Sequence, residues 1–437
     1  MTETVVPADQ TSKPALTGPR LILRAVFYAL LSPMYLAAPR FTRHFVSTMR
    51  TAGVRGIELP KQIASHRVLS PEADEQRAKL FEDLRALVAQ DDWIGLAGKL
   101  EELDRSRAQL AQSEQRLADL ALDFLRHDLA EAVGMPTMCN YDYYFEIPDS
   151  VLARVEDAAR AHPDNPWLTA LLAQVHIDRG WCARGGGWSH EVTEEGWHGL
   201  MNSFETAHAL LQRFDVEDLR SSMYARVQFQ LLATADADDG LRHARGAYHD
   251  WSDLDVCNPQ PHRSFAFFAL PRWFGSWPEF EDEAQAAVAR TEHIMGKGAY
   301  AHFYLEAFEY DEHCALTMLD VPLFIEALDD LIRRDSDPVC QALRAAVLIG
   351  EMTEPEPVTI LSEFFQRDNN TKRDALRAMV RRIFETYVTH LPTEQDSEYE
   401  GRVLDQMTAA FAQDLMAGQT LEITPDGVRA VPQQAST

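Results

Sequence analysis

The chain has 437 residues, of which 46% are hydrophobic and 25% are charged, a balance that argues against disorder along its whole length. Its formal net charge is −27, with 68 acidic against 41 basic residues. This argues against a nucleic-acid partner, because phosphate backbones are bound by clustered Lys and Arg. The five cysteines form no CxxC pair, which argues against a disulfide framework or a structural zinc site and fits a reducing, cytoplasmic compartment: Cys139, Cys182, Cys257, Cys314 and Cys340.

The first 60 residues differ in composition from the rest of the chain. Residues 1–19 are rich in Thr, Pro and Ala and are predicted to be a disordered tail. Residues 20–60 form a basic, apolar leader that we expect to be helical. Its apolar run contains Arg24 and Pro33, so it is a poor signal peptide and a poor membrane span, which needs about 20 apolar residues. Either the leader packs on the following helices as a capping pair, or residues 20–50 contact the surface of the inner membrane.

Residues 61–418 are predicted to be helices joined by short turns. Apolar side chains recur at helical spacing in residues 72–90 and 113–133; in the first segment they are Leu80, Phe81, Leu84, Leu87 and Val88. Helix starts are indicated where a capping side chain precedes a proline, at Ser70-Pro71, Asn165-Pro166 and Asp337-Pro338. No stretch of this body alternates with period two. The sequence therefore predicts an all-α body.

The C-terminal residues 419–437 contain the one strand-like segment. Residues 420–424 and 428–431 are rich in β-branched side chains and are separated by Pro425-Asp426-Gly427. This arrangement predicts a small β-hairpin, which is marginal by itself in water. We expect it to dock on a helix or to remain a tail.

One helical hairpin carries a pattern known from repeat proteins. It consists of Asn165-Pro166-Trp167, Leu171, Gln174, Gly180-Trp181, Phe204, Ala207 and Ala209. This pattern resembles the two helices of a degenerate tetratricopeptide (TPR-like) unit, although the 34-residue spacing of that family is not kept. The resemblance implies a right-handed α-solenoid of stacked antiparallel helix pairs, and a role in protein binding.

A loop inside that hairpin and a later turn are rich in Trp, Arg and Gly. The candidate partner-binding residues there are Arg179, Trp181, Arg184, Gly185, Gly186, Gly187, Trp188, Trp197, Arg272, Trp273 and Trp277. The two segments resemble those of an uncharacterised group of bacterial tetratricopeptide-like domains, whose name implies no activity. Arg184 and Arg272 can stack on the Trp rings. The loop then either plugs the inner face of the solenoid or forms a recognition patch, since Trp and Arg dominate binding hot spots.

Motifs of common enzymes are absent from the sequence. It contains no P-loop, GxGxxG, GxSxG or HExxH motif, each of which would indicate a specific chemistry. We therefore assign no catalytic residue and expect no cofactor.

One polar stripe leaves a metal site open as an alternative. His302, Glu306, Glu309 and His313 are spaced 0, 4, 7 and 11 within a predicted helix and share one face. His and Glu are metal ligands in proteins, and Glu/His sets on bundle helices can hold metal centres. Only a neighbouring subset could reach one ion. The other interpretation is a solvated polar stripe lining the concave groove.

Three functions remain open from the sequence. The first is a non-catalytic adaptor or scaffold of the bacterial cytoplasm, which binds a macromolecular partner through its helical groove and its Trp–Gly loop. The second is a metal-dependent enzyme that uses the His/Glu stripe. The third is a peripheral membrane protein anchored by its N-terminal helix.

Overall fold

The structure is a computed structural model that describes residues 71–111, 113–131, 148–185, 189–236, 239–310, 314–334, 338–353, 367–389 and 397–432. Of these, 77% are α-helical, and their strands form one small antiparallel sheet. The all-α prediction is therefore confirmed. The predicted tail 1–19 and leader 20–60 lie outside the described residues. Among the helices that are described, none is long and apolar enough to cross a membrane.

Within each described range, the helices follow one another along the chain with short connections. The first part comprises α3 (Pro71–Ala89), α4 (Trp93–Ser106), α5 (Leu117–Glu131), α6 (Asp149–Ala161), α7 (Pro166–Arg184), α8 (Glu194–Leu211), α9 (Val216–Leu219), α10 (Ser222–Gln230) and the 3-10 helix η1 (Leu231–Thr234). The second part comprises α11 (Gly240–Leu254), α12 (Pro259–Ala269), α13 (Trp277–Met295), α14 (Gly298–Glu309), α15 (Ala315–Met318), α16 (Val321–Arg334), α17 (Pro338–Met352), α19 (Arg367–Tyr387), α20 (Ser397–Ala410), α21 (Ala412–Met416), β1 (Gln419–Thr424) and β2 (Gly427–Pro432).

Helix α7 begins where its capping signal predicts. The Asn165 side chain accepts hydrogen bonds from the backbone N–H groups of Trp167 and Leu168, at 3.1 and 3.0 Å. Pro166 occupies the first helical position, where its missing N–H is not needed. The same device starts α12, where Asn258 caps and Pro259 follows. The other two predicted caps, at residues 70 and 337, lie outside the described residues.

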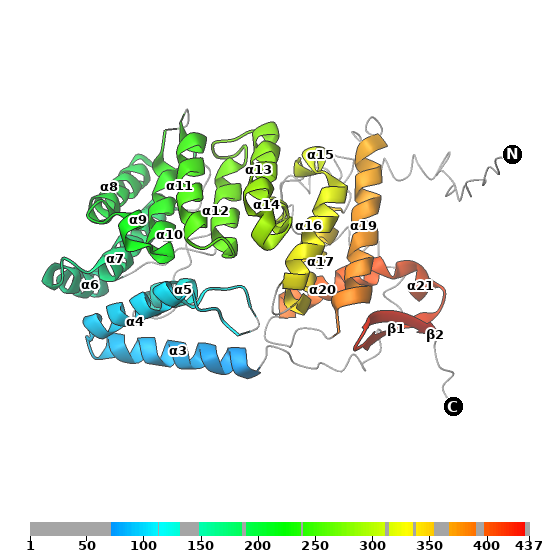
Figure 1. The fold of residues 1–437 in the computed structure, drawn as a ribbon, viewed down its shortest axis with the longest axis horizontal. Coiled ribbons are helices and arrows are strands. Elements are labelled where there is room, and N and C mark those ends of the chain that lie inside the picture. The colour runs from blue at the N-terminus through cyan, green and yellow to red at the C-terminus, as the bar shows by residue number, and fades with distance from the viewer. Residues whose placement is uncertain are drawn as a thin grey trace, which may run out of the picture.

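Two hydrophobic cores hold the described helices together, and they meet at α10. The first core is built from apolar side chains of α3 to α10, and the second from α10 to β2. In Figure 1, α3, α4 and α5 lie together along one side of the array that α6 to α14 form. Helices α16, α17, α19 and α20 and the hairpin make up the opposite end. The junction of the two cores is therefore built from segments far apart in the sequence.

The predicted C-terminal hairpin is confirmed and docks on a helix. Strands β1 and β2 pair antiparallel, with Thr424 opposite Gly427 at the turn. Leu421 and Val428 are buried, and β2 packs against α19. Docking supplies the apolar burial that an isolated two-stranded hairpin lacks.

The docked turn depends on glycine at position 427, and replacing Gly427 by alanine is expected to destabilise the protein by about 1–3 kcal/mol. Its φ is +111°, and an added Cβ would lie 2.1 Å from the carbonyl oxygen of Glu385. Urea denaturation followed by circular dichroism measures the loss. The matched control is Gly401→Ala in α20, where an added Cβ meets nothing within 4 Å and alanine favours the helix. Equal stability of the two variants would contradict the prediction.

Candidate functional site

The structure brings four of the predicted Trp and Arg residues together. The Arg184 guanidinium lies over the rings of Trp181 and Trp197, 5.5 and 5.2 Å from their centroids. The Trp181 ring meets Trp273 edge to face at 6.4 Å and Phe204 at 5.9 Å. Arg184 therefore bridges α7 and α8 by stacking on an aromatic ring of each, as cation–π geometry allows. We call Trp181, Arg184, Trp197 and Trp273 the Trp–Arg cluster.

The other predicted residues near the cluster have separate roles. Arg179 forms an exposed ion pair with Asp149 at 2.9 Å. Gly185 ends α7 with φ +76°, a backbone conformation that glycine adopts readily. Gly186, Gly187 and Trp188 lie outside the described residues.

Arg272 and Trp277 of the later turn contact other aromatic side chains. Arg272 stacks on Tyr310 at 5.8 Å. Trp277 opens α13 and packs edge to face on the buried Phe280 at 5.6 Å. Trp277 is therefore tied to the second core.

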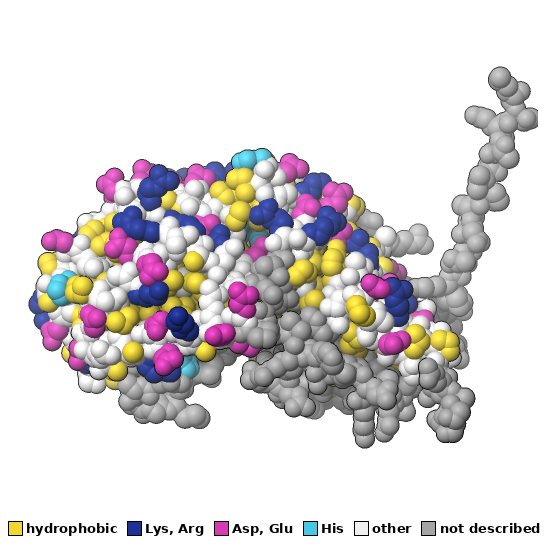
Figure 2. Space-filling view, turned by 60° about the horizontal axis from the view of Figure 1, so that its bottom comes forward, with side chains coloured by type: hydrophobic (Ala, Val, Ile, Leu, Met, Phe, Trp, Pro, Cys, Tyr) yellow, Lys and Arg dark blue, Asp and Glu magenta, His cyan; other side chains and the backbone are white. Residues whose placement is uncertain are grey.

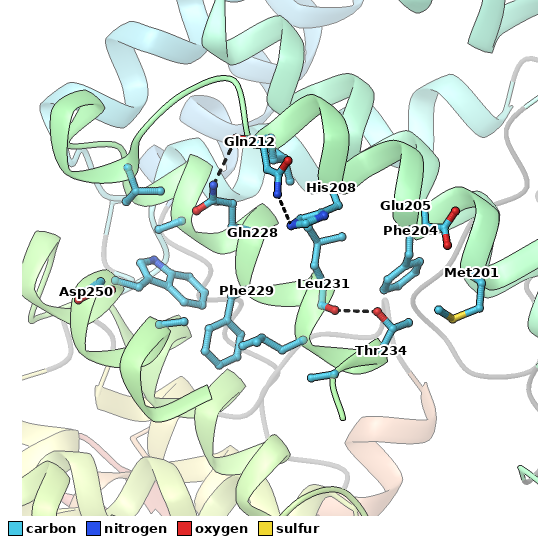
Figure 3. A pocket seen from close by; sticks show the side chains of 17 residues that line it. Met201, Phe204, Glu205, His208, Gln212, Gln228, Phe229, Leu231, Thr234 and Asp250 are labelled. Carbon is cyan, nitrogen blue, oxygen red and sulfur yellow. Dashed lines mark hydrogen bonds between the residues drawn. The ribbon is translucent and has the colours of Figure 1, made fainter. Parts of the chain in front are cut away.

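A groove of about 440 Å³ lies beside the Trp–Arg cluster, between α8, α10, η1 and α11. Its floor is apolar and buried, with Phe204, Leu211, Ala225, Phe229 and Trp251 among the lining side chains. Figure 3 shows Phe204 and Met201 at one side of the groove, and Phe229 and Asp250 at the other. Since Phe204 also contacts Trp181, the cluster and the groove are continuous.

The rim of the groove combines exposed apolar and acidic groups. Trp197 and Met201 are 36% and 40% exposed and lie one helical turn apart on α8, so they share a face. The exposed carboxylates Glu205 and Asp250 line opposite sides of the groove, and neither forms an ion pair with another described residue. The rim therefore exposes apolar surface next to uncompensated negative charge.

The predicted His/Glu stripe is buried rather than solvated at its N-terminal end. His302 and Glu306 are 3% and 7% exposed. Glu306 accepts a hydrogen bond from Arg263 at 2.8 Å, and Glu309 accepts one from Arg344 at 3.2 Å. Both carboxylates are thus engaged by arginines from neighbouring helices.

The metal and membrane alternatives depend in part on residues that the structure does not describe. His313 lies outside the described residues, as do residues 20–50 of the leader. Among the residues that are described, no group of three or more His, Cys, Asp or Glu side chains is arranged to hold a metal ion. Both alternatives therefore stay predictions.

The junction between the two cores is built from buried charged groups. Arg116 forms a two-pronged ion pair with Asp255, with both N···O distances 2.6 Å. Asp119 accepts hydrogen bonds from Asn258 at 3.3 Å and from Arg226 at 3.2 Å. Burial raises the pKa of the Asp119 carboxyl, and the Arg226 guanidinium opposes that change. Buried charges of this kind need such partners, so the contacts fix how the two cores meet.

Comparisons with known proteins add no assignment. No protein-family model matches the chain, no curated protein matches it, and neither does any solved structure. The resemblance to tetratricopeptide-like proteins therefore stays a prediction.

The position of the groove beside α8 and the junction of the two cores were not predicted from the sequence. A weak signal for the groove was present, because Trp197 and Met201 are four residues apart in a predicted helix and share one face. The junction left no such signal, because Arg116 and Asp255 are 139 residues apart.

Proposed function

We propose that this protein is a non-catalytic adaptor or scaffold that binds a segment of a partner protein in the groove beside α8. The observation that carries the proposal is an exposed apolar pair on α8: Met201 lines an apolar groove, and Trp197 lies one helical turn before it. Exposed large apolar side chains next to a concave apolar surface are typical of interaction sites. Trp and Arg together, as in the Trp–Arg cluster, are enriched in binding hot spots.

The lining of the groove indicates the chemistry of the partner segment. The apolar floor favours a segment with apolar side chains on one face, such as an amphipathic helix laid into a groove. Glu205 and Asp250 on opposite sides favour Lys or Arg at the edges of that segment, because complementary charges steer and orient association. We therefore propose an amphipathic segment flanked by basic residues.

The charge distribution on the surface bears on how Glu205 and Asp250 could select a basic segment. On the face drawn in Figure 2, the described acidic and basic side chains are interspersed. The net charge of −27 is thus not gathered into one acidic patch on that face. Specificity for a basic segment would then come from local groups such as Glu205 and Asp250.

The packing order of the helices supports an extended array. Helix α12 packs on α13 and α14, α14 packs on α16 and α17, and α17 packs on α19 and α20. Contacts between helices that follow one another closely along the chain are what stacked helix pairs produce. We include a tetratricopeptide-like solenoid in the proposal on this ground.

The proposal predicts that Trp197→Ala weakens partner binding by about 30-fold or more, which corresponds to about 2 kcal/mol. The free energy of unfolding should change little, because Trp197 is 36% exposed. Ile294→Ala is the matched control, since Ile294 is 41% exposed and lies outside the groove. Thermal melts measure the change in stability. Titrations with the partner protein, identified by the crosslinking experiment below, measure the change in binding.

A photo-crosslinking amino acid placed at Met201 identifies the partner segment. We expect it to capture one protein whose crosslinked peptide is amphipathic and flanked by Lys or Arg, while the same group at Ile294 captures none. Glu205→Gln combined with Asp250→Asn should weaken that complex, and high salt should weaken it in the same direction. If both positions crosslink the same proteins, or if Trp197→Ala leaves binding unchanged, the groove is not the binding site.

A further inference from the structure

A second cavity lies at the junction of the two cores. Its volume is about 330 Å³, within the usual range for small-molecule sites. One wall comes from α3, from residues 110, 111 and 113–116, and from α5, and the other from α12, α14 and α17. The cavity is distinct from the groove beside α8 and shares no lining residue with it. Small-molecule sites occur preferentially where two structural units meet.

The wall formed by α12, α14 and α17 carries polar atoms without a partner. The His302 side chain lines the cavity and is 3% exposed, yet its Nδ1 atom has no hydrogen-bond partner among the described residues. The Nε2 atom of Gln341 is also buried, lines the same cavity and lacks a partner. Unpaired buried polar groups are uncommon in folded proteins. Two of them on one cavity wall indicate a polar ligand.

The same wall is lined by two guanidiniums whose carboxylate partners do not themselves line the cavity. Arg263 and Arg344 both line the cavity, and each is held by one carboxylate of α14, at 2.8 and 3.2 Å. A guanidinium has five N–H donors, so one carboxylate contact leaves capacity for further acceptors. Burial lowers the pKa of Arg344, and the charge of the neighbouring Arg263 lowers it further.

His302 belongs to this basic wall as a neutral group. Burial is the main reason that its pKa lies well below the usual value, and His262, Arg263 and Arg344 act in the same direction. Its ring stacks on His262 with centroids 5.9 Å apart and planes 3° apart. A neutral imidazole can donate or accept at Nδ1, so it can contact either a protonated or an unprotonated ligand oxygen.

We propose that the cavity binds a small molecule through one anionic oxygen group, a carboxylate or a phosphate, which accepts hydrogen bonds from Gln341, Arg263 and Arg344 beside His302. Charge-assisted bonds from arginine to such groups are strong and directional. The opposite wall is lined by three carboxylates, those of Glu114, Asp119 and Asp123, and by the guanidiniums of Arg77 and Arg116. The Glu114 carboxylate also lies 4.0 Å from His302 Nε2. Acidic groups outnumber basic ones on this wall, which disfavours a second anionic group, so the other end of the ligand is uncharged or cationic.

Isothermal titration calorimetry of the full chain tests this inference. The probes are inorganic phosphate, butanoate, succinate and the uncharged butanamide. We expect saturable binding of butanoate or phosphate, weaker binding of succinate, and none of butanamide. The stronger of the two preferred probes identifies the anionic group as a carboxylate or a phosphate.

Two variants locate the binding in the cavity. Gln341→Leu and Arg344→Gln should each weaken binding of the preferred probe by about 10-fold or more, because each removes a donor to the anion. Arg245→Gln is the control, because Arg245 pairs with Glu283 away from the cavity and binding should be unchanged. If Arg344→Gln does not fold, Gln341→Leu decides the question. No saturable binding of either probe, or equal binding by Gln341→Leu and the wild type, would leave the cavity as a water-filled junction and overturn the proposal.

Discussion

Replacing Asp178 by alanine is expected to lower the free energy of unfolding by about 3–5 kcal/mol. The Asp178 side chain is fully buried in α7 and forms a two-pronged ion pair with Arg126 of α5, at 2.7 and 2.6 Å. Gln174 donates a third hydrogen bond to it at 3.3 Å. Removal of the carboxylate takes both of its hydrogen bonds from a buried guanidinium, which keeps its contact with the partly exposed Asp123 at 3.1 Å. The loss of this charge compensation in the interior dominates the effect.

Three further variants separate the pair from the individual charges. Arg126→Met combined with Asp178→Leu should recover most of the loss, because apolar pairs of similar size often replace buried ion pairs without penalty. Asp178→Asn tests whether the Asp178 carboxyl is ionised. Burial raises its pKa, while Arg126 opposes that shift. Replacement of an ionised carboxylate by a neutral amide is costly, because the amide cannot compensate the Arg126 charge. Asp157→Ala is the control, because its ion pair with Arg160 is exposed and such pairs contribute little. Chemical denaturation at neutral pH measures all four. A loss for Asp178→Ala no larger than for Asp157→Ala would refute the prediction.

Acidification from about pH 7.5 to about pH 4.5 is expected to remove about 3 kcal/mol of stability through His262. Its side chain is fully buried. The Nε2 atom lies 3.2 Å from the carbonyl oxygen of Val256, which only accepts, so Nε2 carries the proton. The Nδ1 atom then accepts from the Tyr248 hydroxyl at 2.9 Å. Both bonds suit the neutral ring.

The sign of the effect follows from the two pKa values. Burial is the main reason that the pKa of His262 falls to about 4 in the folded protein, with Arg290 lowering it and the Val256 bond and Asp255 opposing. The unfolded chain has the ordinary value of about 6.5 and binds more protons between these two values. The stability that the neutral His262 ring contributes is therefore fully present above about pH 6.5, and it is lost as the pH falls toward about 4.

Urea denaturation across that pH range measures the effect as a difference between proteins. The wild type should lose stability more steeply with falling pH than His262→Gln, which has no group to titrate there. His198→Gln is the control, because His198 is exposed and its loss should leave the slope unchanged. Parallel pH profiles for the wild type and His262→Gln would show that the buried ring does not control acid stability.

The local elements could be predicted because their causes are local. Apolar side chains three and four residues apart place Leu80, Leu84 and Val88 on the buried face of α3. Asn165 and Pro166 start α7, and the Pro425-Asp426-Gly427 turn pairs the final strands. In each case the residues that determine the structure lie within a few positions of each other, so the spacing is visible in the sequence.

The candidate site could be predicted only in part. Arginine stacking on tryptophan was expected, and Arg184 does stack on Trp181 and Trp197. Arg272 also stacks on Tyr310, a contact that depends on where the turn after α12 meets the end of α14. The groove itself requires four separate helical elements to converge, and no spacing in the sequence indicates that they do.

The sequence by itself determined the helical class, the start of α7 and the final hairpin, since each depends on short-range spacing. Only the tertiary structure decided which charged residues are buried. His302, Glu306 and Asp178 resemble surface residues in the sequence, because His, Glu and Asp are usually exposed. Glu306 and Asp178 are buried here because arginines from other helices pair their carboxylates, and burial of charge is tolerated only with such partners. His302 is buried beside the Arg263–Glu306 pair as a neutral ring. Those pairings depend on helix faces that meet after the chain has folded, and the second cavity lies where they meet.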